Sequence, residues 1–157
     1  MGNTVLIYCE EAGAHNTGKY HPESPLRLKA IQLAFDDNDM KLPVVRPEPA
    51  TESDILRNHT QSYIDTIKEC CLGGSTYPDP DTVMGPESWN AALLSAGAGI
   101  TATKLIMDGT YDNAFIMMRP PGHHAEIDRA MGFCLFTNIA ITPKWLQAEK
   151  GLKRIAI

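Results

Sequence analysis

Two adjacent histidines, His123 and His124, are the residues of this 157-residue sequence best placed to do chemistry. They follow a Pro-Pro-Gly turn, and the apolar run at 114–118 before that turn is typical of a buried strand. Open α/β sheets bind their ligands in loops at the carboxyl ends of strands. Since imidazole is the usual side chain for proton transfer near neutral pH, a rigid loop here could direct two rings at one reacting centre.

The histidine pair gains specificity from the residues around it. Alone, two adjacent histidines are a weak signal, and Pro-Pro-Gly is also the composition of an ordinary tight turn. The longer segments are RPPGHHAE at 119–126 and MGFC at 131–134. These segments resemble the signature of the histone deacetylase family, which includes bacterial histone deacetylase-like amidohydrolases, acetylpolyamine amidohydrolases and acetoin-utilisation proteins.

The resemblance extends over nearly the whole chain. Further matching segments, in family order, are HPESP at 21–25, HT at 59–60, DPDT at 79–82 and PES at 86–88. The resemblance implies a single α/β domain over residues 1–157, the amino-terminal part of the arginase/deacetylase fold. That fold has three layers, α/β/α, around a mainly parallel sheet.

By resemblance, the histidine pair carries the catalytic roles. His124 matches the histidine that moves protons to and from the attacking water and the leaving amine. His123 matches the partner that stabilises the charge that develops. The family uses zinc, but its zinc ligands and a catalytic tyrosine come from sequence beyond the part that residues 1–157 match. We therefore expect no zinc ligand in this chain and no hydrolysis by the chain alone.

Four further residues match substrate-binding positions of the family. Asp79 matches a carboxylate at the rim of the site, and Gly132 with Phe133 matches the wall of the narrow channel around the acyl-lysine stem. Arg27 matches an arginine in the internal cavity through which acetate leaves. Each also has a plain structural explanation, with Asp79 as a turn former, Phe133 as a core residue and Arg27 as a solvated helix residue.

These features support one main interpretation and two alternatives. The chain is a truncated member of the family, whose complete form hydrolyses acetylated amines, acetyl-lysine or acetylpolyamine, with zinc as cofactor. The first alternative is a non-catalytic oligomeric assembly or binding module that keeps the deacetylase half-fold. The second is a new metal site built from His15, His21, His59 or the histidine pair.

Hydrophobic periodicity predicts the elements that position these residues. Strands are expected at 4–9, 43–46, 114–118 and 154–157, and helices at 25–35, 53–58, 60–73, 86–107 and 138–150. Thr60 and either Thr51 or Ser53 are expected to cap helices. Pro143 should kink the last helix or restart it, because an interior proline costs roughly 3 kcal/mol or more.

Two packing details follow from the same patterns. In the first helix, Leu26, Ala30, Leu33 and Ala34 are predicted to form the apolar face. The strand at 114–118 should have an open edge, because in the resembled fold the fourth strand lies beyond two strands that this chain does not have. Open edges recruit other chains, so we expect a homo-oligomer, most simply a two-fold dimer. Either this edge pairs across chains, or the segment 154–157 is exchanged or repositioned beside it.

The composition of the chain limits the kinds of partner that it is expected to bind. The net charge is −5 and there is no basic block, which argues against nucleic acid. The four cysteines form no C-x-x-C pair and are typical of free thiols in a cytoplasmic protein. No apolar run reaches membrane-spanning length and no signal-peptide pattern is present, so we expect no membrane partner. The expected substrate is an acetylated amine, if a partner half completes the site.

Overall fold

The computed structural model describes residues 2–73, 77 and 79–157. Its centre is a parallel sheet in the order β2-β1-β3, formed by β1 (Thr4–Ile7), β2 (Val44–Val45) and β3 (Asn113–Ile116). The predicted order of the first three strands is confirmed, although each strand is shorter than the sequence indicated. β1 is the central strand, and Val5 to Ile7 are at most 6% exposed.

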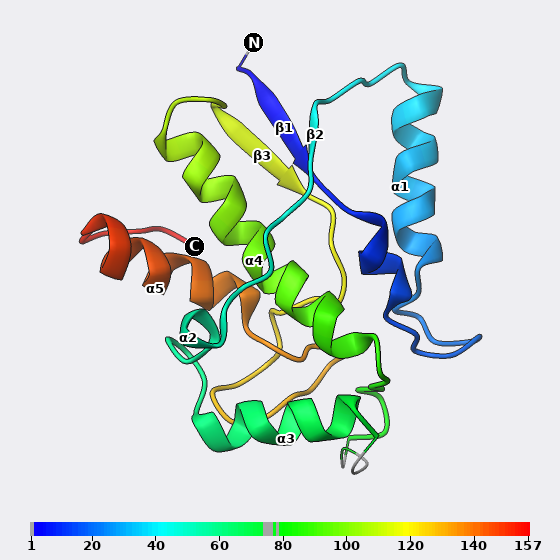
Figure 1. The fold of residues 1–157 in the computed structure, drawn as a ribbon. Helices are drawn as coiled ribbons and strands as arrows, with labels where there is room; N and C mark the ends of the chain where they lie inside the picture. The colour runs from blue at the N-terminus through cyan, green and yellow to red at the C-terminus, as the bar shows by residue number, and fades with distance from the viewer. Residues whose placement is uncertain (1, 74–76, 78) are drawn as a thin grey trace.

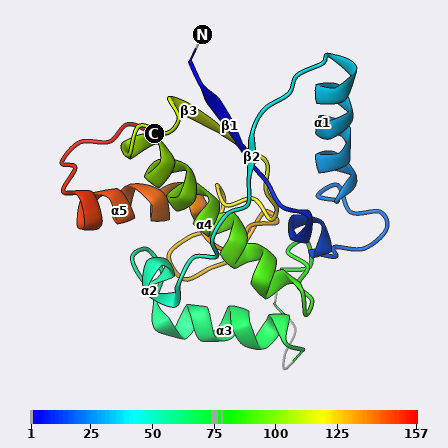
Figure 2. The same cartoon turned by 45° about the horizontal axis from the view of Figure 1, so that its top comes forward.

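The helices cover both faces of this sheet (Figures 1 and 2). They are η1 (Glu10–Ala14, a 3-10 helix), α1 (Leu26–Asp37), α2 (Glu52–Ile55), α3 (Gln61–Cys71), α4 (Ser88–Met107) and α5 (Asn138–Lys150). Successive side chains of a strand point to opposite faces. Accordingly Val5 and Ile7 pack against α4, whereas Leu6 packs against Leu28 of α1. The expected three-layer α/β/α arrangement is confirmed.

A second and larger core lies between α3, α4 and α5. Thr60 caps α3 by accepting a hydrogen bond from the Tyr63 backbone N–H, and Thr51 forms a capping box with Asp54. The Thr60 cap was predicted, and Thr51 is the one of the two predicted candidates, Thr51 and Ser53, that caps α2. Each cap satisfies backbone donors that a helix start leaves open. None of the helices in the described ranges is both long and apolar enough to cross a membrane.

The predicted apolar face of α1 is wrong. Leu26 is 71% exposed and Leu33 is 53% exposed, whereas Leu28, Ile31 and Phe35 contact the sheet side. Both sets of residues recur at helical spacing, so the periodicity alone did not choose between them. The observed face buries the larger Ile and Phe side chains, and the predicted face included two alanines.

The predicted strand at 154–157 is also wrong. Gly151 ends α5 in the left-handed conformation, with φ of 67°, and the residues after it form no regular element. Figure 1 shows this segment, in red, folding back along α5 toward α4. Ile155 packs against the core of α3, α4 and α5, so the segment lies over helices and pairs with no strand of the described sheet.

Pro143 does not restart α5, which is continuous from Asn138 to Lys150. At the position of Pro143, α5 packs closely against α4. A Cβ added at Gly99 of α4 would lie 2.0 Å from the Thr142 hydroxyl oxygen, so only glycine allows this approach. The two helices therefore hold each other at the point where the proline removes a hydrogen bond.

Candidate active site

The loop that carries the histidine pair has a buried anchor, Arg119, which lies three residues after the end of β3. The Arg119 side chain is 0% exposed, and its Nε and Nη2 donate to the two carboxylate oxygens of Glu23, each at 2.7 Å. The same guanidinium donates to the carbonyls of Ala12, at 3.1 Å, and His15, at 2.9 Å. The base of the loop is thus fixed to η1 and to the segment before α1.

The two imidazoles lie side by side at the end of the loop. The ring centroids of His123 and His124 are 4.2 Å apart, with 52° between the ring planes, and both residues are exposed. Within the described residues neither ring makes a hydrogen bond. Gly132 packs directly against the His124 ring, because a Cβ at Gly132 would lie 2.7 Å from His124 Cδ2. Only a residue without a side chain allows this contact.

Phe133 forms a wall of the same site. Its backbone has φ of 69°, a left-handed conformation unusual for a bulky residue, and its N–H donates to the Thr82 hydroxyl at 3.3 Å. Its ring meets the ring of His21 edge to face, with centroids 4.7 Å apart. A pocket of about 450 Å³ is lined by five of the six predicted site residues, Arg27, His123, His124, Gly132 and Phe133.

Asp79, the sixth predicted site residue, lies on the other side of the Gly132–Phe133 wall. It lines an adjoining pocket together with both of these residues. The Thr82 hydroxyl donates to its carboxylate at 2.6 Å, and this hydrogen bond is the main reason why the pKa of Asp79 is lowered. All six predicted residues therefore gather around one wall, while the chemical role of each stays a prediction.

Comparison with known proteins identifies the chain. The sequence profile of the histone deacetylase domain matches residues 21–157. The chain belongs to the histone deacetylase family. It is 36% identical over 139 residues to the histone deacetylase-like amidohydrolase of Pseudomonas aeruginosa, which covers 87% of this chain and 37% of that protein. It is also 36% identical over 151 residues to a probable deacetylase of Methanothermobacter thermautotrophicus, covering 96% and 44%.

A solved structure of the family has the same fold. The crystal structure of the HDA15 HD domain matches with a TM-score of 0.86 and 29% sequence identity, over 94% of this chain and 44% of that chain. The chain therefore spans less than half the length of these deacetylase relatives. Its three-stranded sheet and helices belong to the arginase/deacetylase fold.

Sequence reasoning missed the buried cluster beneath the histidine pair. His15 Nδ1 lies 2.7 Å from the Ser88 hydroxyl, and His15 Nε2 lies 3.8 Å from the Glu23 carboxylate. Burial lowers the pKa of His15 to about 4, and the Arg119 charge adds to the effect. Ser, His and Glu are the residue types of a nucleophile system. However, His15 and Ser88 are at most 1% exposed, so substrate has no access to the ring or the hydroxyl and the cluster is structural.

The remaining histidines are committed to structural hydrogen bonds. His59 Nδ1 contacts the Ile127 carbonyl at 3.1 Å, and its Nε2 accepts the Thr137 N–H at 3.0 Å. His21 contacts the carbonyls of Glu23 and Asp81. Across 2–73, 77 and 79–157, no three His, Cys, Asp or Glu side chains are grouped closely enough to hold a metal ion. The donors present there do not fit the zinc site that the family generally uses.

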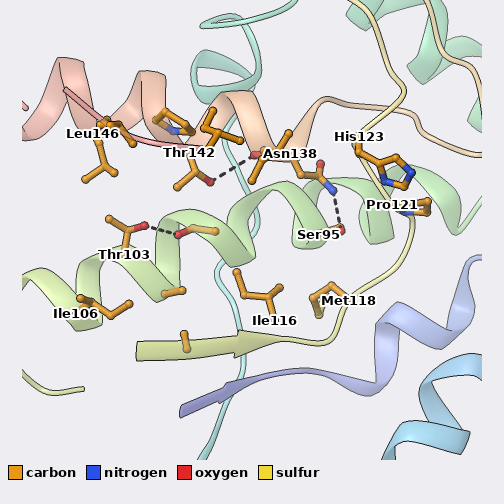
Figure 3. Close-up of a pocket in the computed structure, with 18 of the residues that line it drawn as sticks. Ser95, Thr103, Ile106, Ile116, Met118, Pro121, His123, Asn138, Thr142 and Leu146 are labelled. Atoms are coloured by element: carbon orange, nitrogen blue, oxygen red, sulfur yellow. Dashed lines mark hydrogen bonds between the residues drawn. The ribbon is translucent and has the colours of Figure 1, made fainter. Parts of the chain in front are cut away.

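A second hollow lies beside the site (Figure 3). This groove, of about 560 Å³, runs between β3, α4 and α5 and is also lined by residues 155–157. Its walls are mainly apolar, and His123 lies at one end of it, so this ring borders both the groove and the pocket. In the described sheet β3 pairs with β1 alone, which leaves its edge open. Ile116, on the groove side of β3, is 43% exposed.

Proposed function

We propose that residues 1–157 form the part of an amide-hydrolase site that moves protons and holds the acyl group. The proposed reaction is hydrolysis of an acetylated amine, either acetyl-lysine or acetylpolyamine. One observation carries the proposal, which is the exposed histidine pair against the Gly132–Phe133 wall in a chain of the deacetylase family. The apolar Phe133 ring suits the methylene stem of such a substrate.

The proposed proton transfers fit this geometry. In the reaction water adds to the carbonyl carbon, the C–N bond breaks, and acetate and the free amine leave. One proton must leave the water and one must reach the amine nitrogen. His124 has no described hydrogen-bond partner on its ring, so it can accept the first proton and deliver the second. His123, whose ring centroid lies 4.2 Å from that of His124, stabilises the charge that develops.

We further propose that the family's metal is held by donors outside residues 1–157. Metal content and hydrolysis of an acetyl-lysine peptide test this, first on the chain alone and then with candidate partner chains. We expect neither stoichiometric zinc nor turnover from the chain alone, and turnover that His124→Ala abolishes once a complementary chain is added. Zinc-dependent turnover by the chain alone would refute the proposal of outside donors. Absence of turnover with every complementary deacetylase chain would refute the proposed hydrolase.

A second candidate function is a non-catalytic oligomeric module, which the groove and the open β3 edge favour. The proposed occupant of the groove is a second copy of the chain, with two β3 edges pairing across a two-fold axis. Sedimentation should then give a dimer at micromolar concentration. Ile116→Lys should give a monomer, and Leu33→Lys, on exposed α1 surface, should not. A monomeric starting protein would exclude this candidate.

We also infer that the protein works in the cytoplasm. Cys9, Cys71 and Cys134 are buried thiols outside any disulfide. Free thiols are the usual state in a reducing compartment. Fractionation of the source cells tests the location directly, and recovery of the protein outside the cytoplasm would contradict it.

A further inference from the structure

Residues 125–137 form a loop whose two ends meet. The Thr137 hydroxyl donates to the Ala125 carbonyl at 2.7 Å, which closes the loop on itself. Compact surface loops with close ends are frequently functional. We call this segment the wall loop, because it carries Gly132 and Phe133, which line the pocket of the candidate site.

His59, which lies just before α3, bridges the two ends of the wall loop. Its Nε2 lies 3.0 Å from the Thr137 backbone nitrogen, and its Nδ1 lies 3.1 Å from the Ile127 carbonyl oxygen. A backbone N–H can only donate and a carbonyl can only accept, so Nε2 carries no proton and Nδ1 carries one. These two hydrogen bonds fix the ring as one neutral tautomer. Because His59 is 4% exposed, either nitrogen would lack a hydrogen bond if its partner moved away.

A second proton on His59 breaks this bridge. The proton would sit on Nε2 and face the Thr137 N–H, so that two donors point at each other. Burial lowers the pKa of His59, and the charge of Lys144 on α5 adds to the effect, against the hydrogen bond to the Ile127 carbonyl. The other titratable group that faces the ring is the stacked Tyr63 of α3. The bridge is therefore complete above pH 6.5, the ordinary pKa of histidine, and opens as the pH falls below it.

The other side chains that hold the wall loop do not change in this pH range. They are the hydroxyls of Tyr63, Tyr77 and Thr82, which bond to its backbone. A hydroxyl keeps both its donor and its acceptors in mild acid. Asp79, which accepts the Thr82 hydroxyl at 2.6 Å, has its pKa lowered by this hydrogen bond, so it stays largely charged at pH 4.5. His59 is thus the acid-sensitive member of this described set.

We propose that His59 is a positioning residue that fixes the Gly132–Phe133 wall only while its own ring is neutral. In acid the ends of the wall loop separate, and the wall loses its fixed place beside the histidine pair. His59 is not among the described residues that line the pocket, so it acts through the loop. As a statement about the reaction, the inference rests on the proposed function, to which it adds a loss of substrate binding in acid.

The test follows the edge-to-face contact between the Phe133 and His21 rings, whose centroids are 4.7 Å apart, by NMR on the chain of residues 1–157. We expect nuclear Overhauser effects between the two rings at pH 7 and their loss at pH 4.5. His59→Gln retains an acceptor for the Thr137 N–H but takes up no proton, so it should keep the contact at both pH values. Since His21 is present in both proteins, its own protonation cannot explain the difference.

The matched control is His15→Gln, which removes a second buried histidine, one that lies outside the wall loop. This variant should lose the ring contact at pH 4.5 as the starting protein does. If His59→Gln does not fold, the amide signals of Ile127 and Thr137 in the starting protein decide the question. Both signals should shift with the midpoint at which the His59 ring takes up its proton.

Three results would overturn the inference. They are a ring contact that persists at pH 4.5 in the starting protein, an equal loss in folded His59→Gln, and amide signals that do not follow the His59 ring. None of these measurements depends on hydrolysis. A wall that loosens in acid as expected, in a completed enzyme without turnover at any pH, would therefore reject the proposed function alone.

Discussion

The buried histidine, His15, and the exposed histidine pair, His123 and His124, both lie near the Arg119–Glu23 anchor but have opposite properties. His15 is 1% exposed, contacts Ser88 through one ring nitrogen and has its pKa lowered by burial. His123 and His124 are exposed and have no described hydrogen bonds on their rings. The comparison teaches that available ring nitrogens beside a pocket, more than the residue types nearby, distinguish a candidate proton carrier from a structural histidine.

The largest effect is expected at the anchor itself. Arg119→Met should lower the free energy of unfolding by roughly 3–5 kcal/mol, because it leaves the buried Glu23 carboxylate without its main partner. Urea denaturation at neutral pH measures the loss. A loss below about 1 kcal/mol would mean that the pair does not fix the loop.

The buried histidine should make the fold sensitive to acid. His15 has a pKa of about 4 in the fold, against its ordinary value of 6.5, so the unfolded chain binds its proton more readily. The stability it contributes is complete above pH 6.5 and is lost as the pH falls toward 4, by about 3 kcal/mol in all. The groups that face it are Arg119, Glu23 and His21.

The measurement compares the free energy of unfolding at pH 7 and pH 4.5 in the starting protein and in His15→Gln. The variant should lose less stability between these two pH values, although its stability at pH 7 is lower. Equal losses in the two proteins would assign the acid sensitivity to other groups, such as His59, whose pKa is also lowered by burial.

Gly132→Ala probes the support of the exposed pair. Gly132 has φ of 55° and Gly109 has φ of 78°, so alanine at either position should cost roughly 1 kcal/mol for backbone strain. Only at Gly132 would the new Cβ meet His124, whereas nothing lies within 4 Å of the one at Gly109. Gly109→Ala is therefore the control. We expect displaced His124 ring signals in Gly132→Ala alone, and unchanged signals would contradict the proposed support.

The smallest effect is expected at the pair. His124→Ala should change the free energy of unfolding by no more than about 0.5 kcal/mol, since the exposed ring makes no described hydrogen bond. Thermal and urea denaturation check this. A loss comparable to that of Arg119→Met would show that the ring is structural and would erase the contrast with His15.

Much of the fold could be predicted because its signals are local. The Thr60 cap, the choice of Thr51 or Ser53 as the cap of the preceding helix, and the first three strands depend on residues close in sequence. The face of α1 and the fate of residues 154–157 could not be predicted in this way. Both depend on which distant surface is available, and that surface is made by other elements. Ile155 thus lies against the core of α3, α4 and α5, although its own sequence is typical of a strand.

In the candidate site, too, the features that depend on local sequence could be predicted, and those that depend on distant residues could not. The family signature predicted the six residues around the Gly132–Phe133 wall, and the structure brings them together. The Glu23–Arg119 pair joins residues 96 apart in sequence and has no local pattern. A charged residue directly after the apolar run at 114–118 was the available signal, because a buried arginine requires a partner. The prediction that this run forms a buried strand was wrong, since Phe115 and Ile116 of β3 are 44% and 43% exposed.

His123 borders two hollows at once, the groove along β3 and the pocket of the candidate site. The His123 ring is therefore part of the lining of both the groove and the pocket. A compound or polypeptide that enters the groove at this end changes the surroundings of a ring that the pocket also uses, without occupying the pocket. A compound designed for the groove would then contact His123 from the side of α4 and α5, outside the pocket of the candidate site.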